Sequence, residues 1–136
     1  MFQAPPLTIT RDPDGFPFPM PGAQMAKFAA FNYQVAAGTG IFTLPNNAEI
    51  IGWTLNVTTA FNAGTTNTLD IGVAGALTQF AATLALGSVG QVVSGFVASQ
   101  LFTRLPGVTT VTVRYNQTGG AASAGVATLL AEYIIR

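Results

Sequence analysis

Apolar and polar residues alternate along several segments of the chain after Lys27. A period of two residues is typical of a β-strand that buries one face and exposes the other to water. The pattern is clearest at residues 31–35, 51–58, 69–73 and 111–115, and further strands are expected at residues 40–44, 91–97 and 125–135. The last segment is almost continuously apolar, which favours a strand that is covered on both faces.

The phase of the alternation identifies the expected core. Trp53, Leu55 and Val57 share one phase with Ile51, and Leu69 and Ile71 share another. A lone tryptophan can also stack on a sugar or a base. Its place within an alternating strand favours a core position instead, with its side chain on the same sheet face as its apolar neighbours.

The segments between the expected strands carry turn residues, such as Pro45-Asn46-Asn47 and Gly119-Gly120. About seven or eight short strands separated in this way predict an all-β protein, an antiparallel β-sandwich or jelly-roll-like domain. Residues 76–86 are an exception, because the spacing of Leu77, Phe80 and Leu84 also suits a short helix. We expect a loop with some helix there.

The start of the chain has a different composition from the rest. Most of the prolines lie at or before Pro21, and proline favours extended backbone. Three bulky apolar residues, Phe16, Phe18 and Met20, alternate with these prolines. We therefore expect an extended, Pro-rich N-terminal arm over residues 1–26 that contacts a partner, followed by a β-sandwich domain over residues 27–136. The first residues do not resemble a signal peptide.

Composition narrows the range of partners. Only 7% of the residues are charged and the net charge is zero, so no long-range field attracts nucleic acid or anionic lipid. The eighteen threonines suit strands that face water without charge. Few charges and few edge-protecting lysines favour self-association, and we expect a homo-oligomer. No run of residues is long and apolar enough for a membrane helix. We therefore expect no membrane partner, and the zero net charge argues against a nucleic acid as partner.

Candidate catalytic chemistry is sparse, because the chain contains neither His nor Cys. A carboxylate pair of Glu49 and Asp70 on adjacent strands would suit a glycoside hydrolase. The alternative is that Glu49 begins a strand and Asp70 lies on an outer sheet face, as structural residues do. We favour the structural alternative and expect no enzymatic activity, no cofactor and no metal site.

Two stretches of the chain carry a family resemblance. Residues 42–75, FTLPNNAEIIGWTLNVTTAFNAGTTNTLDIGVAG, and residues 119–135, GGAASAGVATLLAEYII, resemble small all-β proteins encoded among the virion genes of tailed bacteriophages. Those proteins are similar to head decoration (cement) proteins, which bind the outside of the assembled capsid, often as trimers. The resemblance consists of strands and turns and contains no catalytic residue.

The resemblance implies a structural virion protein that is located on the capsid surface. Its expected partners are the major capsid protein and other copies of the same chain, most simply in a homotrimer. The long Pro-rich arm is a departure from the family pattern, and Phe16, Phe18 and Met20 are the candidate contacts to the capsid or to neighbouring subunits. Two alternatives remain open: a tail or fibre component that binds a host glycan, and the acid-pair hydrolase.

Overall fold

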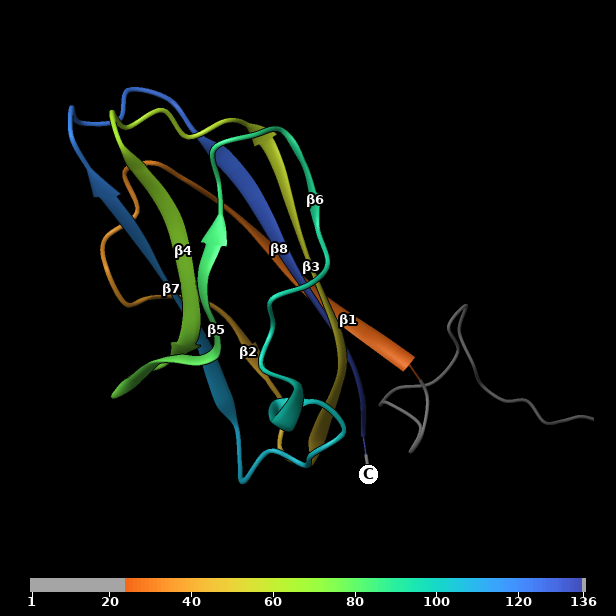
Figure 1. Cartoon of the computed structure of the whole chain (residues 1–136). Helices are drawn as coiled ribbons and strands as arrows, with labels where there is room; N and C mark the ends of the chain where they lie inside the picture. The colour runs from red at the N-terminus through yellow and green to blue at the C-terminus, as the bar shows by residue number, and fades with distance from the viewer. Residues whose placement is uncertain (1–23, 136) are drawn as a thin grey trace, which may run out of the picture.

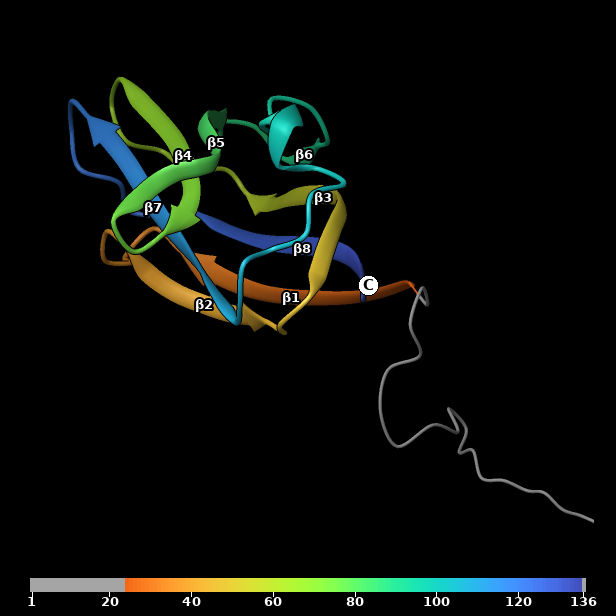
Figure 2. The same cartoon turned by 90° about the horizontal axis from the view of Figure 1, so that it is seen from below.

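The chain forms two four-stranded antiparallel sheets that pack face to face (Figures 1 and 2). The structure is a computed structural model that describes residues 24–135. Its elements are β1 (Gln24–Asn32), β2 (Thr39–Leu44), β3 (Ala48–Thr59), β4 (Thr66–Val73), β5 (Ala76–Ala85), β6 (Gly90–Val92), the short 3-10 helix η1 (Ala98–Gln100), β7 (Thr109–Thr118) and β8 (Val126–Ile135). The predicted all-β sandwich is confirmed.

The strand order is that of an eight-stranded jelly roll. Sheet 1 has the order β1-β8-β3-β6 and sheet 2 has the order β2-β7-β4-β5. The chain crosses between the sheets at almost every connection, so the core is built from non-local pairs. β1 and β8 pair from Gln24 opposite Ile134 to Asn32 opposite Val126, which places the first strand beside the last. Residues 24–26, which the sequence placed in the arm, belong to β1.

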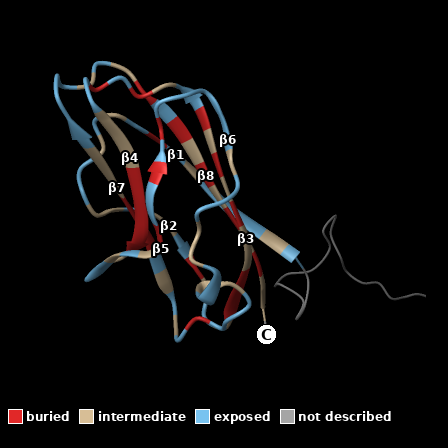
Figure 3. Ribbon diagram, in the orientation of Figure 1, coloured by how far each residue is buried: buried red, intermediate tan, exposed pale blue. Residues whose placement is uncertain are grey.

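The inner faces of the two sheets form one continuous apolar core (Figure 3). The residues expected in it, Trp53, Leu55, Val57, Leu69 and Ile71, are all buried. Trp53 is 5% exposed, and its ring lies 5.2 Å from that of Phe80 and 5.9 Å from that of Phe96, measured between centroids. Because these three aromatic side chains come from β3, β5 and the loop after β6, they tie the two sheets together on one side of the sandwich.

The expected phase of β3 is wrong at Ile51. The pairing of β3 with β8 shifts between Ile50 and Gly52, and Ile50 is fully buried whereas Ile51 is only partly buried. A β-bulge adds one residue to a strand, so side chains before and after it exchange faces. The alternation therefore identifies the buried face from Trp53 onward but misplaces the residues before the bulge.

The expectation of a loop with some helix at residues 76–86 is also wrong, because residues 76–85 form β5. Ile71 of β4 pairs with Ala81 of β5, and Val73 pairs with Ala76. Two residues of advance along β4 therefore correspond to five residues along β5. These irregularities break the two-residue period. The adjacent residues Phe80 and Ala81 are both buried, and the next buried residue is Leu84, so burial along this strand does not alternate.

The strand expected at residues 91–97 is shorter than predicted. β6 ends at Val92, and the chain then forms an isolated bridge between Phe96 and Ala81 and passes through η1. It next follows the start of β3, where the Phe102 N–H donates to the Ile50 carbonyl at 2.8 Å. This segment covers the open side of the sandwich between β3 and β5.

Gly72 marks a close approach of backbone to backbone. A Cβ atom at this position would lie 2.1 Å from the carbonyl oxygen of Ala76 and 2.5 Å from the carbonyl carbon of Leu77. Backbone atoms cannot rotate away, so we expect Gly72→Ala to lower the free energy of unfolding by about 3 kcal/mol. Gly107→Ala, which meets open space, is the control. Equal urea midpoints for the two variants would contradict this account of the β4–β5 hairpin.

Candidate assembly surface

The two candidate catalytic acids lie in different sheets. Glu49 is the second residue of β3 in sheet 1, and Asp70 belongs to β4 in sheet 2. The arrangement that a carboxylate pair would require, with both acids on adjacent strands, is therefore not present. The structure places Glu49 at a strand start and Asp70 on an outer sheet face, as the structural alternative predicted.

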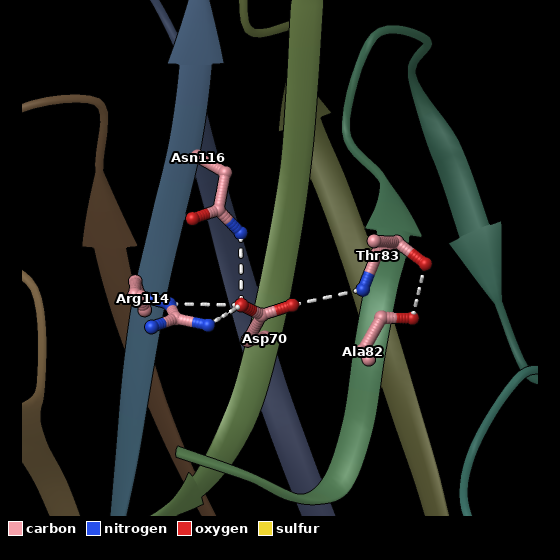
Figure 4. Close-up of polar contacts among 5 residues, drawn as sticks. All are labelled: Asp70, Ala82, Thr83, Arg114 and Asn116. Carbon is pink, nitrogen blue, oxygen red and sulfur yellow. Dashed lines mark hydrogen bonds and ion pairs between the residues drawn. The ribbon is translucent and has the colours of Figure 1, made fainter.

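Asp70 is the centre of a polar cluster that joins three strands of sheet 2 (Figure 4). The residue is only 2% exposed. Its carboxylate accepts hydrogen bonds from Arg114 Nε at 2.8 Å, from the Asn116 amide at 2.9 Å and from the Thr83 N–H at 2.9 Å. Arg114 and Asn116 come from β7, whereas Thr83 belongs to β5 and has a positive φ of 55°. The cluster therefore fixes the bulged edge strand β5 to the centre of its sheet.

The environment of Asp70 favours its ionised form. Burial acts to raise the pKa of this carboxyl, but the hydrogen bonds from Asn116, Thr83 and Arg114, together with the charge of Arg114, outweigh burial and lower the pKa below its ordinary value of 3.8. Both carboxylate oxygens accept hydrogen bonds from the protein, and the group is almost fully buried, so this arrangement is well suited to a structural role.

Replacing Asp70 by Asn should destabilise the fold by about 1–3 kcal/mol near neutral pH, because Arg114 loses its counter-charge. The folded pKa of Asp70 is lowered, so its contribution is present above the unfolded pKa and is lost as pH falls through the folded value. Urea unfolding should thus give a constant wild-type-minus-variant difference from pH 7 to pH 5 that shrinks below 3.8. Glu132→Gln, at a partly exposed acid, is the control. A difference that grows on acidification would contradict this assignment.

The outer face of sheet 2 is polar, and several of its side chains pair within the sheet, although the buried Thr112 hydroxyl has no hydrogen-bond partner there. Thr43 and Thr110 contact each other through their hydroxyls at 3.3 Å, and Thr118 donates to Thr66 at 2.7 Å. Together with the Asp70 cluster, these pairs give a surface of hydroxyl, amide and guanidinium groups. Such a face is well suited to contact with water.

The outer face of sheet 1 is different, because it exposes apolar side chains. Phe28 on β1 is 68% exposed, and it lies opposite Leu130 on β8, which in turn lies opposite Thr54 on β3. Val126 at the start of β8 is also exposed, as are Val89 and Val93, which flank β6. Four of the six exposed large hydrophobic residues in the described chain therefore belong to sheet 1 or flank it, which indicates a surface that another molecule covers.

A shallow hollow lies in this face. It is lined by residues from all four strands of sheet 1, namely Phe28, Thr54, Asn56, Gln91, Thr128 and Leu130. None of the six is charged, so its chemistry suits an uncharged partner surface rather than a phosphate or a metal ion. We call these six residues the sheet-1 hollow.

One end of the sandwich exposes the other two large apolar side chains. Phe102 follows η1 with a positive φ of 59° and is 68% exposed, and Val108 precedes β7. A bulky residue rarely adopts this backbone conformation, and such strain is often found where a side chain is presented to a partner. The Phe102 N–H is fixed by its hydrogen bond to Ile50, so the loop is tied to β3.

The sequence analysis did not single out the exposed residues Phe28 and Phe102 or the half-buried Leu130. The strand expected at residues 31–35 overlaps β1 only at Phe31 and Asn32, because the alanines at 26, 29 and 30 suit either face and hide the alternation before Phe31. The arm residues Phe16, Phe18 and Met20 lie outside the described residues. A signal was nevertheless present in QMAKFAAFN, where a large aromatic residue at Phe28 stands out of phase with the buried Phe31.

Two further properties concern residues 24–135. In this part of the chain, no three acidic side chains gather into a group that could hold a metal ion. No helix within it has the length and hydrophobicity needed to cross a membrane.

Comparison with known proteins relates the fold to chains of phage capsids. No protein-family model matches the chain, and no curated protein matches it in sequence. A chain in the cyanophage Pam1 capsid asymmetric unit is similar in structure with a TM-score of 0.64 and 18% identity, over 100% of this chain and 94% of that one. A chain in the capsid of Ralstonia phage GP4 has a TM-score of 0.62 and 21% identity, over 95% and 92%.

A third similar structure comes from another host. A chain in the acid-stable capsid of Helicobacter pylori bacteriophage KHP30 has a TM-score of 0.63 and 15% identity, over 85% of this chain and 90% of that one. The three likenesses extend over nearly the whole of each chain. They establish a shared fold, a small jelly roll that occurs in the capsids of phages from different hosts.

Proposed function

We propose that this protein is a structural virion protein of a tailed bacteriophage, a decoration (cement) subunit that binds the outer surface of the capsid and stabilises it. The observation that carries the proposal is the near end-to-end likeness of its fold to chains in three phage capsids. The family resemblance of residues 42–75 and 119–135 supports the same role.

The surface chemistry agrees with a permanent place in an assembly. The sheet-1 hollow is uncharged and has Phe28 at its rim, whereas the outer face of sheet 2 is polar and internally hydrogen-bonded. We propose that sheet 1 faces the capsid and sheet 2 faces the solvent. Covering the exposed apolar side chains of sheet 1, such as Phe28, is favourable, and a polar face is stable in water.

The arm extends this contact to the major capsid protein. Phe16, Phe18 and Met20 are proposed to anchor the subunit to the capsid or to a neighbouring subunit. A homotrimer is the proposed oligomer, on the strength of the family resemblance. No catalytic step is proposed, because the buried carboxylate of Asp70 is fully engaged and lies in a different sheet from Glu49.

Sedimentation with capsids tests the proposal. The purified full chain is added to undecorated capsids of the virus that carries its gene, and bound protein is measured after pelleting. We expect saturable binding at a fixed ratio to the major capsid protein, together with a higher temperature of capsid disruption. Binding that rises without saturation, or no binding, would contradict a decoration role.

The glycan-binding alternative has one observation in its favour, the exposed loop residue Phe102. An aromatic ring that faces solvent can stack on a sugar. A glycan array probed with the full chain and with Phe102→Ala separates the two functions. The decoration role predicts background signal for both proteins. Glycan binding that is lost in the variant would favour a tail or fibre component.

A further inference from the structure

β1 is an unprotected edge of sheet 1. It pairs with β8 over all nine residues without a register shift, and its other side has no strand partner within residues 24–135. The remaining edges are interrupted: β2 and β5 contain bulges, and β6 has three residues. An edge strand presents a row of unpaired N–H and C=O groups, so a long regular edge is a template for another strand.

The sequence of β1 lacks the usual protection against strand addition. QMAKFAAFN contains no proline and no glycine, and its only charge is Lys27. Its central residue is Phe28, which is 68% exposed. A free edge with these properties would expose both backbone polar groups and a large apolar side chain to water, and one partner strand would cover both.

We propose that β1 pairs with β1 of a second copy of this chain. The two strands run antiparallel about a two-fold axis through Phe28, and they join two copies of sheet 1 into one continuous eight-stranded sheet. The basis is that β1 is chemically self-complementary about its middle residue. Phe28 faces Phe28 of the second copy, and on either side the facing pairs are Lys27 with Ala29, Ala26 with Ala30, Met25 with Phe31, and Gln24 with Asn32.

The alternating direction of side chains along a strand and the position of Lys27 select this register. Directly opposite residues point to the same sheet face, so a two-fold axis must pass through a residue rather than between two residues. An axis through Lys27 would set two lysines face to face, which is unfavourable, and would pair only seven residues. An axis through Ala29 would also pair only seven and would set Lys27 against Phe31. Phe28 alone aligns the full strand.

The pairing also accounts for the exposure of Phe28 on sheet 1. Phe28, Leu130 and Thr54 form a cross-strand row within one copy. In the pair, this row continues through the second Phe28 into the same residues of the other copy, and the two phenyl rings become a cross-strand aromatic pair. The two sheet-1 hollows then lie on one face of the joined sheet. The inference is independent of capsid binding, and it permits other contacts, including a trimer, elsewhere on the surface.

Cysteine cross-linking tests the register directly, because the chain contains no cysteine. Facing residues of an antiparallel pair have Cα atoms about 4.5–5.5 Å apart, within disulfide range. The full chain carrying Phe28→Cys is oxidised with diamide and analysed on non-reducing gels. We expect a disulfide-linked dimer as the major product. Phe102→Cys, at a site of equal exposure on a different surface, is the control and should remain monomeric on the gel.

A second pair of variants tests the axis. When tested separately, Ala26→Cys and Ala30→Cys should each remain monomeric on the gel. In the proposed register, the introduced cysteine and the same cysteine of the second copy are offset by four residues, about 13 Å along the strand. An equal mixture of the two should give the mixed dimer. In addition, Phe28→Asp should lower the mass of the otherwise unmodified protein in light scattering by half.

Three results would overturn the proposal. The first is cross-linking of Phe28→Cys that is no faster than that of Phe102→Cys. The second is self-cross-linking of Ala26→Cys or Ala30→Cys at the rate of Phe28→Cys. The third is an unchanged mass for Phe28→Asp. Circular dichroism of each variant verifies the fold. We expect substitutions of Phe28 to leave the fold intact, because this side chain is exposed.

Discussion

Trp53→Ala is expected to lower the free energy of unfolding by about 3–5 kcal/mol. Trp53 is 5% exposed and packs between Phe80 and Phe96, so its removal leaves a large cavity between β3, β5 and the loop after β6. Dispersion contacts on all sides of the ring are lost at the same time. Urea unfolding followed by circular dichroism measures the change, since the variant has no tryptophan for fluorescence.

Phe102→Ala is the matched control, because it also removes an aromatic ring but from a side chain that is 68% exposed. Its effect should stay within about 0.5 kcal/mol, as for most surface substitutions. Similar midpoints for the two variants would show that Trp53 is not a core residue, and its place in sheet 1 would have to be revised.

Deleting residues 1–23 is expected to leave the sandwich folded and to weaken capsid binding more than tenfold. The cut precedes β1, which begins at Gln24, so every described strand is retained. Phe16, Phe18 and Met20 can each contribute about 1.5–3 kcal/mol when fully buried. A tenfold change in the dissociation constant corresponds to about 1.4 kcal/mol, and half of the summed contribution exceeds that value.

The prolines of the arm contribute to the expected strength of capsid binding. They restrict the backbone of the free arm, so ordering the arm on a partner loses less conformational entropy than ordering a flexible tail. Several arms on one oligomer would add avidity. Replacing Phe16, Phe18 and Met20 by Ser in the full chain should therefore reproduce most of the loss.

The control for the arm is a triple substitution of Gln3, Thr8 and Thr10 by Ala, which leaves the three apolar residues in place. It should bind capsids like the unmodified chain in the sedimentation assay. If the truncated chain instead binds normally but unfolds at lower urea concentration, the arm packs on its own domain and the anchoring proposal fails.

An unbroken two-residue period located β4 and β7, and an apolar run located β8, but the period at residues 31–35 missed most of β1, which ends at Asn32. In β3 the residues from Trp53 to Val57 keep the predicted phase. The prediction failed where a bulge changed the phase, at Ile51 and throughout residues 76–86. A bulge is a property of the pairing between strands, so a single strand's sequence does not reveal it.

The site was less predictable than the fold for the same reason. Asp70 was expected on an outer face, but its partners Arg114 and Asn116 are distant in the sequence, and the register of β4 against β7 brings them to it. The exposed edge at β1 depends on strand order, which places β1 outside β8. Neither the order nor the register follows from local patterns.

The most direct test of the decoration role is a pair of cryo-electron microscopy reconstructions of undecorated capsids, without and with the added full chain. The proposal predicts extra density on the outer surface, at symmetry-related sites, into which the eight-stranded sandwich of this 14.0 kDa chain fits with sheet 1 toward the shell. Identical reconstructions at saturating protein, or density confined to the tail of complete virions, would contradict it.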